Sequence, residues 1–266
     1  MASLFCPTSF LRPSSVYRSR NLRLQSHYHH HLFPLPALSS FPSLSSFRGP
    51  QFICTPTYSN EGTVSVINFE DFAEKDWSFL DHDDITSDEQ RDRKAKQIIS
   101  AGDIRENSRV LVSIGNEDFI DRLVDLSPCQ LLLIVHESLF TLAGIKEKYD
   151  KVKCWQGELI YVPEKWAPFD VVFLYCLPGL PFELDEIFKV LAARCSSGAR
   201  LVISYPQGRE AVQNHRQHHS DVIVSDLPDK VSLEKVAADH SFETVEFVDE
   251  PGFYLAVLKF RKAGEE

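Results

Sequence analysis

Charge of one sign is missing from the first 60 residues. They contain no Asp, no Glu and no Lys, while five Arg stand among many Ser, Pro and Phe. An acid-free N-terminus that carries Arg and Ser is typical of an organelle transit peptide rather than of a folded element. The Met1-Ala2-Ser3 start and the lack of a clear amphipathic helix favour the chloroplast stroma, with the mitochondrion as second choice. A disordered basic tail would have the same composition.

Long hydrophobic runs are missing as well. No stretch approaches the roughly 18 apolar residues of a membrane span, and the longest runs, such as Leu131 to Val135, suit buried strands. The chain carries a net charge of −10, and because residues 1–60 contribute only the five Arg, residues 61–266 carry −15. This acidity argues against nonspecific nucleic-acid binding, which needs a cationic surface to replace counterions.

Several chemical motifs are absent too. No two of the six cysteines have a C-x-x-C spacing, so neither a zinc site nor a dithiol motif is indicated. The cysteines are Cys6, Cys54, Cys129, Cys154, Cys176 and Cys195. The chain has no P-loop, no G-x-S-x-G and no G-x-G-x-x-G/A after its first expected strand. These absences exclude a P-loop protein and argue against a hydrolase with a nucleophile elbow and a dinucleotide dehydrogenase.

What is present from Arg109 onward is an alternation of apolar runs with helical stretches. The expected strands are 110–114, 131–135, 151–155, 170–177 and 199–205, and the expected helices are 87–101, 118–126, 139–149, 183–195 and 231–240. Such βαβ units indicate a mostly parallel sheet that is covered on both faces. The last two strands, 243–248 and 253–260, have only a turn between them and should pair as an antiparallel hairpin.

Three segments outside this alternation need separate interpretations. Residues 61–105 form an acidic, helical extension whose part 61–85 either covers a site as a flap or packs on the surface of the domain 106–263. The acidic run Asp81 to Asp84 resembles a metal site, but adjacent acids near a helix start more often cap it. Residues 206–228 read as a polar loop. Its histidines could act as a base or bind metal, or could simply be solvated, and they are His215, His218 and His219.

Four segments carry a resemblance to a known family. They are Phe169 to Phe173, Gly157-Glu158, Phe182 to Pro206 and Phe242 to Phe260. In these segments the chain resembles the class I S-adenosylmethionine-dependent methyltransferases over residues 86–260, and it looks closest to the small-molecule branch that includes the quinone-biosynthesis methyltransferases. The resemblance implies an α/β fold with a Rossmann-like, doubly wound, mostly parallel sheet that ends in an antiparallel β-hairpin. It also implies S-adenosyl-L-methionine as cofactor and a small-molecule methyl acceptor.

The family's first loop, typically G-x-G-x-G, is degenerate here. Aligning on Gly115 places Glu117 and Phe119 at the second and third glycines. A side chain at either position is expected to intrude on the cofactor space, and the Glu117 carboxylate would face the cofactor's own carboxylate.

The resemblance also implies other contacts to the cofactor. The acid that holds the ribose hydroxyls aligns with His136, or with Glu137 after a shift of one residue, and Glu158 aligns with the acid that accepts from the adenine amino group. Tyr175 falls at the end of the fourth strand, either facing the pocket or packed in the core. The implied cofactor residues are Gly115, Asn116, Glu117, His136, Glu137, Glu158 and Tyr175. No catalytic residue and no metal ligand is assigned.

Two hypotheses of different class follow. One is an active methyltransferase that acts on a small organellar molecule, where catalysis can rest on positioning alone. The other is a methyltransferase-like protein that has lost its donor site and serves as a binding or assembly partner. The degenerate glycine loop motivates the second hypothesis, and the persistence of Gly115 and Glu158 supports the first.

Overall fold

The computed structural model describes residues 74–81 and 87–261. All of them belong to the second of the two units into which the chain divides, Ser65–Glu266. The expected transit peptide, most of the acidic extension and residues 82–84 of the acidic run lie outside the described residues. Within the described ranges, no helix is long and apolar enough to cross a bilayer.

The described elements follow the expected alternation of strands and helices. The strands are β1 (Arg109–Ser113), β2 (Leu131–His136), β3 (Lys153–Gln156), β4 (Phe169–Leu174), β5 (Cys195–Tyr205), β6 (Phe242–Glu250) and β7 (Phe253–Phe260). The α-helices are α1 (Asp88–Ala101), α2 (Glu117–Leu126), α3 (Leu139–Lys148), α4 (Leu184–Arg194), α5 (Gly208–His218) and α6 (Lys230–Asp239). Short 3₁₀ turns are η2 (Ser78–Leu80), η3 (Leu159–Tyr161), η4 (Glu164–Trp166) and η5 (Leu177–Gly179).

The strands form one seven-stranded sheet in the order β3-β2-β1-β4-β5-β7-β6. The first five strands are parallel to one another, whereas β7 runs antiparallel to both β5 and β6. The expected doubly wound sheet with a terminal antiparallel hairpin is therefore confirmed. Because the last strand inserts between β5 and β6, the hairpin forms the end of the sheet rather than an appendage to it.

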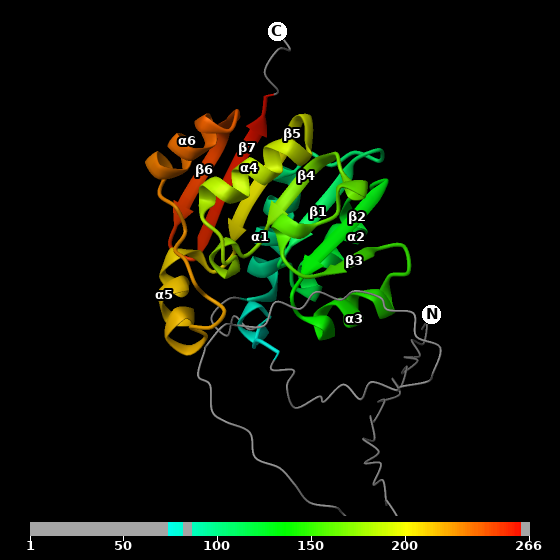
Figure 1. Ribbon diagram of the computed structural model, residues 1–266. Helices are drawn as coiled ribbons and strands as arrows, with labels where there is room; N and C mark the ends of the chain where they lie inside the picture. The colour runs from blue at the N-terminus through cyan, green and yellow to red at the C-terminus, as the bar shows by residue number, and fades with distance from the viewer. Residues whose placement is uncertain (1–73, 82–86, 262–266) are drawn as a thin grey trace, which may run out of the picture. The chain divides into compact units, whose positions relative to one another are not determined.

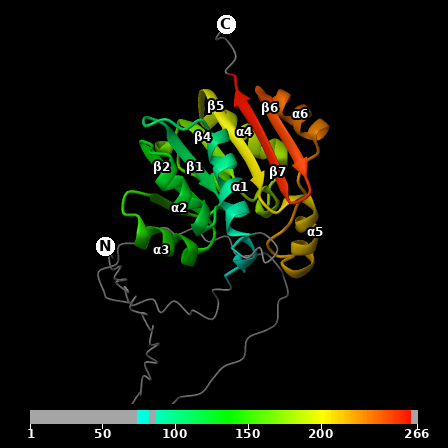
Figure 2. The same cartoon turned by 180° about the vertical axis from the view of Figure 1, so that it is seen from behind.

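Helices cover both faces of the sheet, as Figures 1 and 2 show from opposite sides. Alternate strand residues divide between two cores, since successive side chains of a strand point to opposite faces. In β1, Val110 and Val112 pack with α1, α2 and α3, whereas Leu111 packs with α4, α6 and the segment 77–80. The central strands are thus covered on both faces, which explains why they read as continuous hydrophobic runs.

Short polar side chains cap the starts of four of the six described α-helices. Ser87, Asn116, Ser138 and Asp229 precede α1, α2, α3 and α6, and each accepts a hydrogen bond from a backbone N–H of the first turn. Such N-caps satisfy donors that a helix start leaves free. The cap at Asn116 fixes where the turn after β1 ends.

Two sequence expectations were wrong. Residues 208–218 were expected to be loop, but they form α5. The fifth strand was expected to begin at residue 199, but β5 already begins at Cys195, directly after α4. Gly198 takes a left-handed conformation (φ +78°) inside the strand, near a shift in the register between β4 and β5.

Candidate cofactor cleft

The carboxyl ends of β1 and β4 mark the point at which the sheet changes direction. The chain moves outward from β1 through β2 to β3 and then returns to place β4 on the other side of β1. In open α/β sheets, ligands bind outside the carboxyl ends of the strands at such a switch point. The residues to consider are therefore those after β1, β2 and β4, at the lower end of the sheet in Figure 1.

The turn after β1 has an unusual backbone. Ile114 takes a left-handed conformation with φ +56°, which glycine adopts freely and β-branched residues rarely do. The side chain of Ile114 is buried in the core that contains Leu111 and Trp77. Gly115 serves packing, since a Cβ there would lie 2.7 Å from a methyl group of Val112. The position that calls for glycine in this turn is thus occupied by Ile114.

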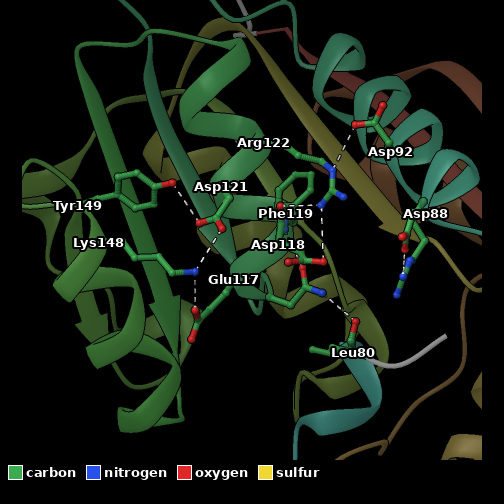
Figure 3. A network of polar contacts seen from close by, with 12 residues as sticks. Leu80, Asp88, Asp92, Glu117, Asp118, Phe119, Asp121, Arg122, Lys148 and Tyr149 are labelled. Atoms are coloured by element: carbon green, nitrogen blue, oxygen red, sulfur yellow. Dashed lines mark hydrogen bonds and ion pairs between the residues drawn. The ribbon is translucent and has the colours of Figure 1, made fainter. Parts of the chain in front are cut away.

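Glu117 does not point into the cleft. It begins α2, and its carboxylate lies 2.9 Å from the ammonium of Lys148 on α3, as Figure 3 shows. Lys148 also lies 3.2 Å from Asp121, and Tyr149 donates to Asp121 over 3.1 Å. The expectation that Glu117 intrudes on the cofactor space was therefore wrong, because a lysine one helix away holds its carboxylate on the flank of the domain.

Phe119 and Tyr175 belong to the core rather than to the cleft. Their rings pack at 4.5 Å between centroids, on the face of the sheet that α1, α2 and α3 cover. Tyr175 is only 5% exposed, and burial raises its pKa. Of the two interpretations of Tyr175, the structure selects the core aromatic. Both rings border a cavity of about 40 Å³ that Asn116 and Leu80 also line.

His136 ends β2 as a buried, neutral side chain. Burial lowers its pKa to about 4, and its Nδ1 accepts a hydrogen bond from the backbone N–H of Ser138 over 2.9 Å. The ring meets that of Trp77 edge to face, with 4.8 Å between centroids. His136 thus orders the start of α3 and supports Trp77.

Glu137 and Glu158 lie close together at the mouth of the cleft. The carboxylate of Glu137 lies 2.6 Å from the ammonium of Lys75 in a half-buried ion pair. Burial raises the pKa of Glu158, the charge of Glu137 raises it further, and Lys75 opposes both effects. The two acids that the resemblance assigned to ribose and adenine are therefore brought together, with Lys75 close enough to act on both.

Trp77 occupies the switch point itself. Its ring is 7% exposed, packs in one core with Ile114, and covers Gly179 so closely that a Cβ there would lie 3.0 Å from it. Because His136 also supports the ring, Trp77 touches the ends of β1 and β2 and the turn that follows β4. A single indole thus closes the point at which this fold offers its ligand site.

Residues 74–81, which we call the strap, hold Trp77 in place from several sides. Asn116 donates through Nδ2 to the carbonyl oxygen of Leu80 over 2.8 Å while its Oδ1 caps α2. Gln207 donates to the carbonyl oxygen of Phe79 over 3.0 Å. The strap therefore crosses the carboxyl edge of the sheet, as the cyan segment of Figures 1 and 2 shows.

His215 of α5 and His219, which follows the helix, complete the attachment of the strap. The rings of His215 and His219 each lie 4.9 Å from that of Phe79, and His219 lies 3.6 Å from Asp76. His215 also shares a 2.6 Å hydrogen bond with Tyr205. Among the described residues, no group of three or more His, Cys, Asp or Glu is placed to hold a metal ion.

The residues present do not fit S-adenosylmethionine in this conformation. A ligand of that size needs several hundred Å³, whereas the indole of Trp77 fills the switch point. The cavity of about 40 Å³ beside Asn116 is a separate space, lined by Phe119 and Tyr175 rather than by Trp77 or Glu137. Ile114 stands where this turn calls for glycine, and Lys75 is paired with Glu137, one of the two residues that the resemblance aligns with the ribose-holding acid.

The sequence left two interpretations of residues 61–85 open, a flap over the site or packing on the domain surface, and the described part, residues 74–81, agrees with the flap. The sequence gave no signal for Lys75. It also suggested Gly115 as the residue whose backbone needs glycine, whereas the left-handed conformation falls on Ile114.

No protein-family model and no curated protein sequence matches the chain. Solved structures do. A chain of the Haloferax volcanii complex between the Trm112 methyltransferase activator and a methyltransferase aligns at a TM-score of 0.54 and 14% identity, over 65% of this chain and 93% of that one. An S-adenosylmethionine-dependent methyltransferase from Clostridium acetobutylicum aligns at 0.51 and 8% identity, over 67% and 94%.

The YcgJ protein of Bacillus subtilis gives a similar result, with a TM-score of 0.51 at 11% identity over 65% of this chain and all of that one. At such low identity these likenesses establish architecture and leave the chemistry of the site open. With its strand order and terminal hairpin, the chain has the fold of the class I S-adenosylmethionine-dependent methyltransferases.

Proposed function

We propose that this chain is a methyltransferase-like protein whose cofactor cleft is closed by its own strap, and that it serves as a binding or assembly partner. The observation that carries the proposal is the position of Trp77, whose ring covers Gly179 and meets His136 at the switch point of the sheet. A cofactor could enter only if the strap left.

Two further observations support a cleft adapted to the strap. Ile114 accepts a left-handed backbone and packs in the same core as Trp77, so the turn contributes a side chain where a cofactor loop contributes space. Lys75 neutralises Glu137, the acid in the best position to hold a ribose. One structurally similar chain comes from a complex of a methyltransferase with an activator protein, which is compatible with a protein partner here.

An active methyltransferase for a small organellar molecule is the second candidate. Glu137 and Glu158 support it, because both acids stay at the mouth of the cleft where an adenosyl group would need them. This candidate requires that the strap be absent from the cleft during turnover, since methyl transfer depends on holding donor and acceptor in line.

Calorimetric titration of the full-length protein with S-adenosylhomocysteine tests the proposal. We expect no heat of binding up to millimolar ligand. Micromolar binding would overturn the closed-cleft proposal, and Glu137→Ala should then weaken that binding. Gly115→Arg is unsuitable as a control, because a side chain at Gly115 would collide with Val112 and disturb the fold itself.

We also propose that the protein works in the chloroplast stroma. The acid-free, Arg- and Ser-bearing composition of residues 1–60 supports import. A fluorescent reporter fused behind residues 1–60 should accumulate in plastids and lose the leader, whereas the same reporter behind residues 61–120 should stay in the cytosol. Cytosolic or mitochondrial accumulation of the first fusion would contradict the plastid assignment.

A further inference from the structure

We infer that the strap is a releasable internal occupant of the cleft, which holds a ligand site in reserve rather than replacing it permanently. This inference rests on the proposed function, because it takes the closed cleft as the resting state. The contacts of Lys75 and Trp77 carry it.

The first step concerns the acids beneath Lys75. Glu137 and Glu158 are close enough that the charge of Glu137 helps to raise the pKa of Glu158, while Lys75 lowers it. Two half-buried carboxylates without a counter-charge repel each other. Lys75 therefore stabilises the closed cleft by neutralising a pair of acids that would otherwise face an open, ligand-accessible mouth.

The second step concerns the aromatic slot. The ring of Trp77 lies over Gly179 and against the edge of His136. This slot takes a flat, two-ring heterocycle, and two carboxylates stand at its mouth beside Lys75. A flat ring next to hydroxyl and amino donors is the chemistry of an adenosyl group, so Trp77 and Lys75 occupy places that such a ligand would need.

The third step concerns how the strap is attached. Its main chain is held by the side chains of Asn116 and Gln207, which donate to Leu80 and Phe79. The indole nitrogen of Trp77 and one carboxylate oxygen of Glu74 are buried without a hydrogen-bond partner among the described residues. Unsatisfied buried groups disfavour the docked state. The docked strap thus carries an energetic cost, and removal of one of its contacts should release it.

The test uses three full-length variants. Lys75→Glu places a third acid beside Glu137 and Glu158, and Trp77→Ala empties the aromatic slot. Lys235→Glu makes the same charge change on the exposed face of α6 and serves as the matched control. Circular dichroism and thermal unfolding establish that each variant is folded. Lys75 is partly exposed, so its substitution spares the core even if Trp77→Ala proves unstable.

Two measurements are made on each protein. Chymotrypsin cleavage after Phe79 and Leu80, followed by mass spectrometry, reports release of the strap without any ligand. Calorimetry with S-adenosylhomocysteine reports whether the cleft binds this ligand. We expect cleavage at least about a hundredfold faster in Lys75→Glu and Trp77→Ala than in wild type. We also expect them to bind with a dissociation constant of about 10 μM or lower, whereas wild type and Lys235→Glu show no binding up to millimolar ligand, because apparent affinity scales with the open fraction.

The outcomes separate the inference from the proposal on which it rests. If the two strap variants show fast cleavage but bind no S-adenosylhomocysteine, no ligand site is held in reserve and the inference is overturned, while the closed-cleft proposal stands. If neither variant speeds cleavage, the strap is not releasable and the inference is also overturned. Tight binding by wild type with slow strap cleavage would instead refute the proposed function.

Discussion

At the residue scale, the turn after β1 shows how one side chain can redirect a site. Ile114 combines a left-handed backbone with a buried side chain. The left-handed conformation costs a β-branched residue roughly 1–2 kcal/mol. That cost persists because the side chain fills space beside Gly179 and under Trp77, so the turn is specialised for packing against the strap.

This specialisation predicts an inverted order of stability at Ile114. Gly should be better than Ala there by about 1 kcal/mol, because Ala keeps the left-handed strain and Gly does not. Urea unfolding of Ile114→Gly and Ile114→Ala measures the difference. Ile203 is the matched control, since it is fully buried in β5, where Gly should be worse than Ala by about 0.5–1 kcal/mol. If the Gly and Ala variants ranked in the same order of stability at both positions, backbone strain at Ile114 would be contradicted.

At the scale of elements, α2 and α3 are joined by a contact that accounts for a glycine. A Cβ at Gly144, in the middle of α3, would lie 2.3 Å from the carboxylate of Glu117. The glycine thus leaves room for Glu117 to reach Lys148. Gly144 and Lys148, one turn apart on α3, keep the Glu117 side chain on the flank of the domain and away from the cleft.

A double-mutant cycle between Gly144→Ala and Glu117→Ala tests this contact. Gly→Ala inside a helix ordinarily stabilises by about 0.5–1 kcal/mol, but in wild type the displaced Glu117 should lose its ion pair and offset that gain. We expect the full gain to return in the Glu117→Ala and Lys148→Met backgrounds, a coupling of about 0.5–1 kcal/mol that shrinks in high salt. Strict additivity in denaturant unfolding would refute the contact.

The elements also show which sequence signals were sufficient. β1, β2 and α2 were predictable because continuous apolar runs and an Asn or Ser cap mark them locally. α5 was missed because its sequence is polar almost throughout, and the helix buries only Gly208 and Val212. The partners of α5, the strap and the β6–β7 turn, are distant in sequence, and no local pattern announces them.

At the scale of the whole molecule, the candidate site was only half predictable. The chain positions of Glu137 and Glu158 followed from strand order, because carboxyl ends of parallel strands meet at one edge of the sheet. What fills the cleft did not follow, since Lys75 and Trp77 reach it from before the first strand through contacts that span more than 50 residues. Glu117 was misplaced because its partner Lys148 lies on another helix.

Acid should weaken the entire fold through His136. Burial lowers the pKa of His136 in the folded state from an ordinary 6.5 to about 4. Between these two pH values the unfolded chain therefore binds a proton at His136 and the folded protein does not. The stability that His136 contributes is therefore complete above pH 6.5 and is lost as the pH falls towards 4, by about 3 kcal/mol in total.

Comparison of wild type with His136→Asn isolates this contribution, because Asn can still accept from the N–H of Ser138 and does not titrate. The difference in unfolding free energy between the two proteins should fall steadily between pH 6.5 and pH 4 and stay level above pH 7. Parallel stability curves across this range would show that His136 does not bear the proton difference.

The position of β7 has a consequence for the order in which the chain can be assembled. β6 pairs with β7 alone, and β7 is made after it. While the protein is being synthesised, β6 must therefore wait as an unpaired strand until Phe260 has left the ribosome, and β5 keeps an open edge for the same interval. Because the strap, which precedes every strand in the chain, docks on a finished carboxyl edge, the first described residues to be translated are among the last that can settle.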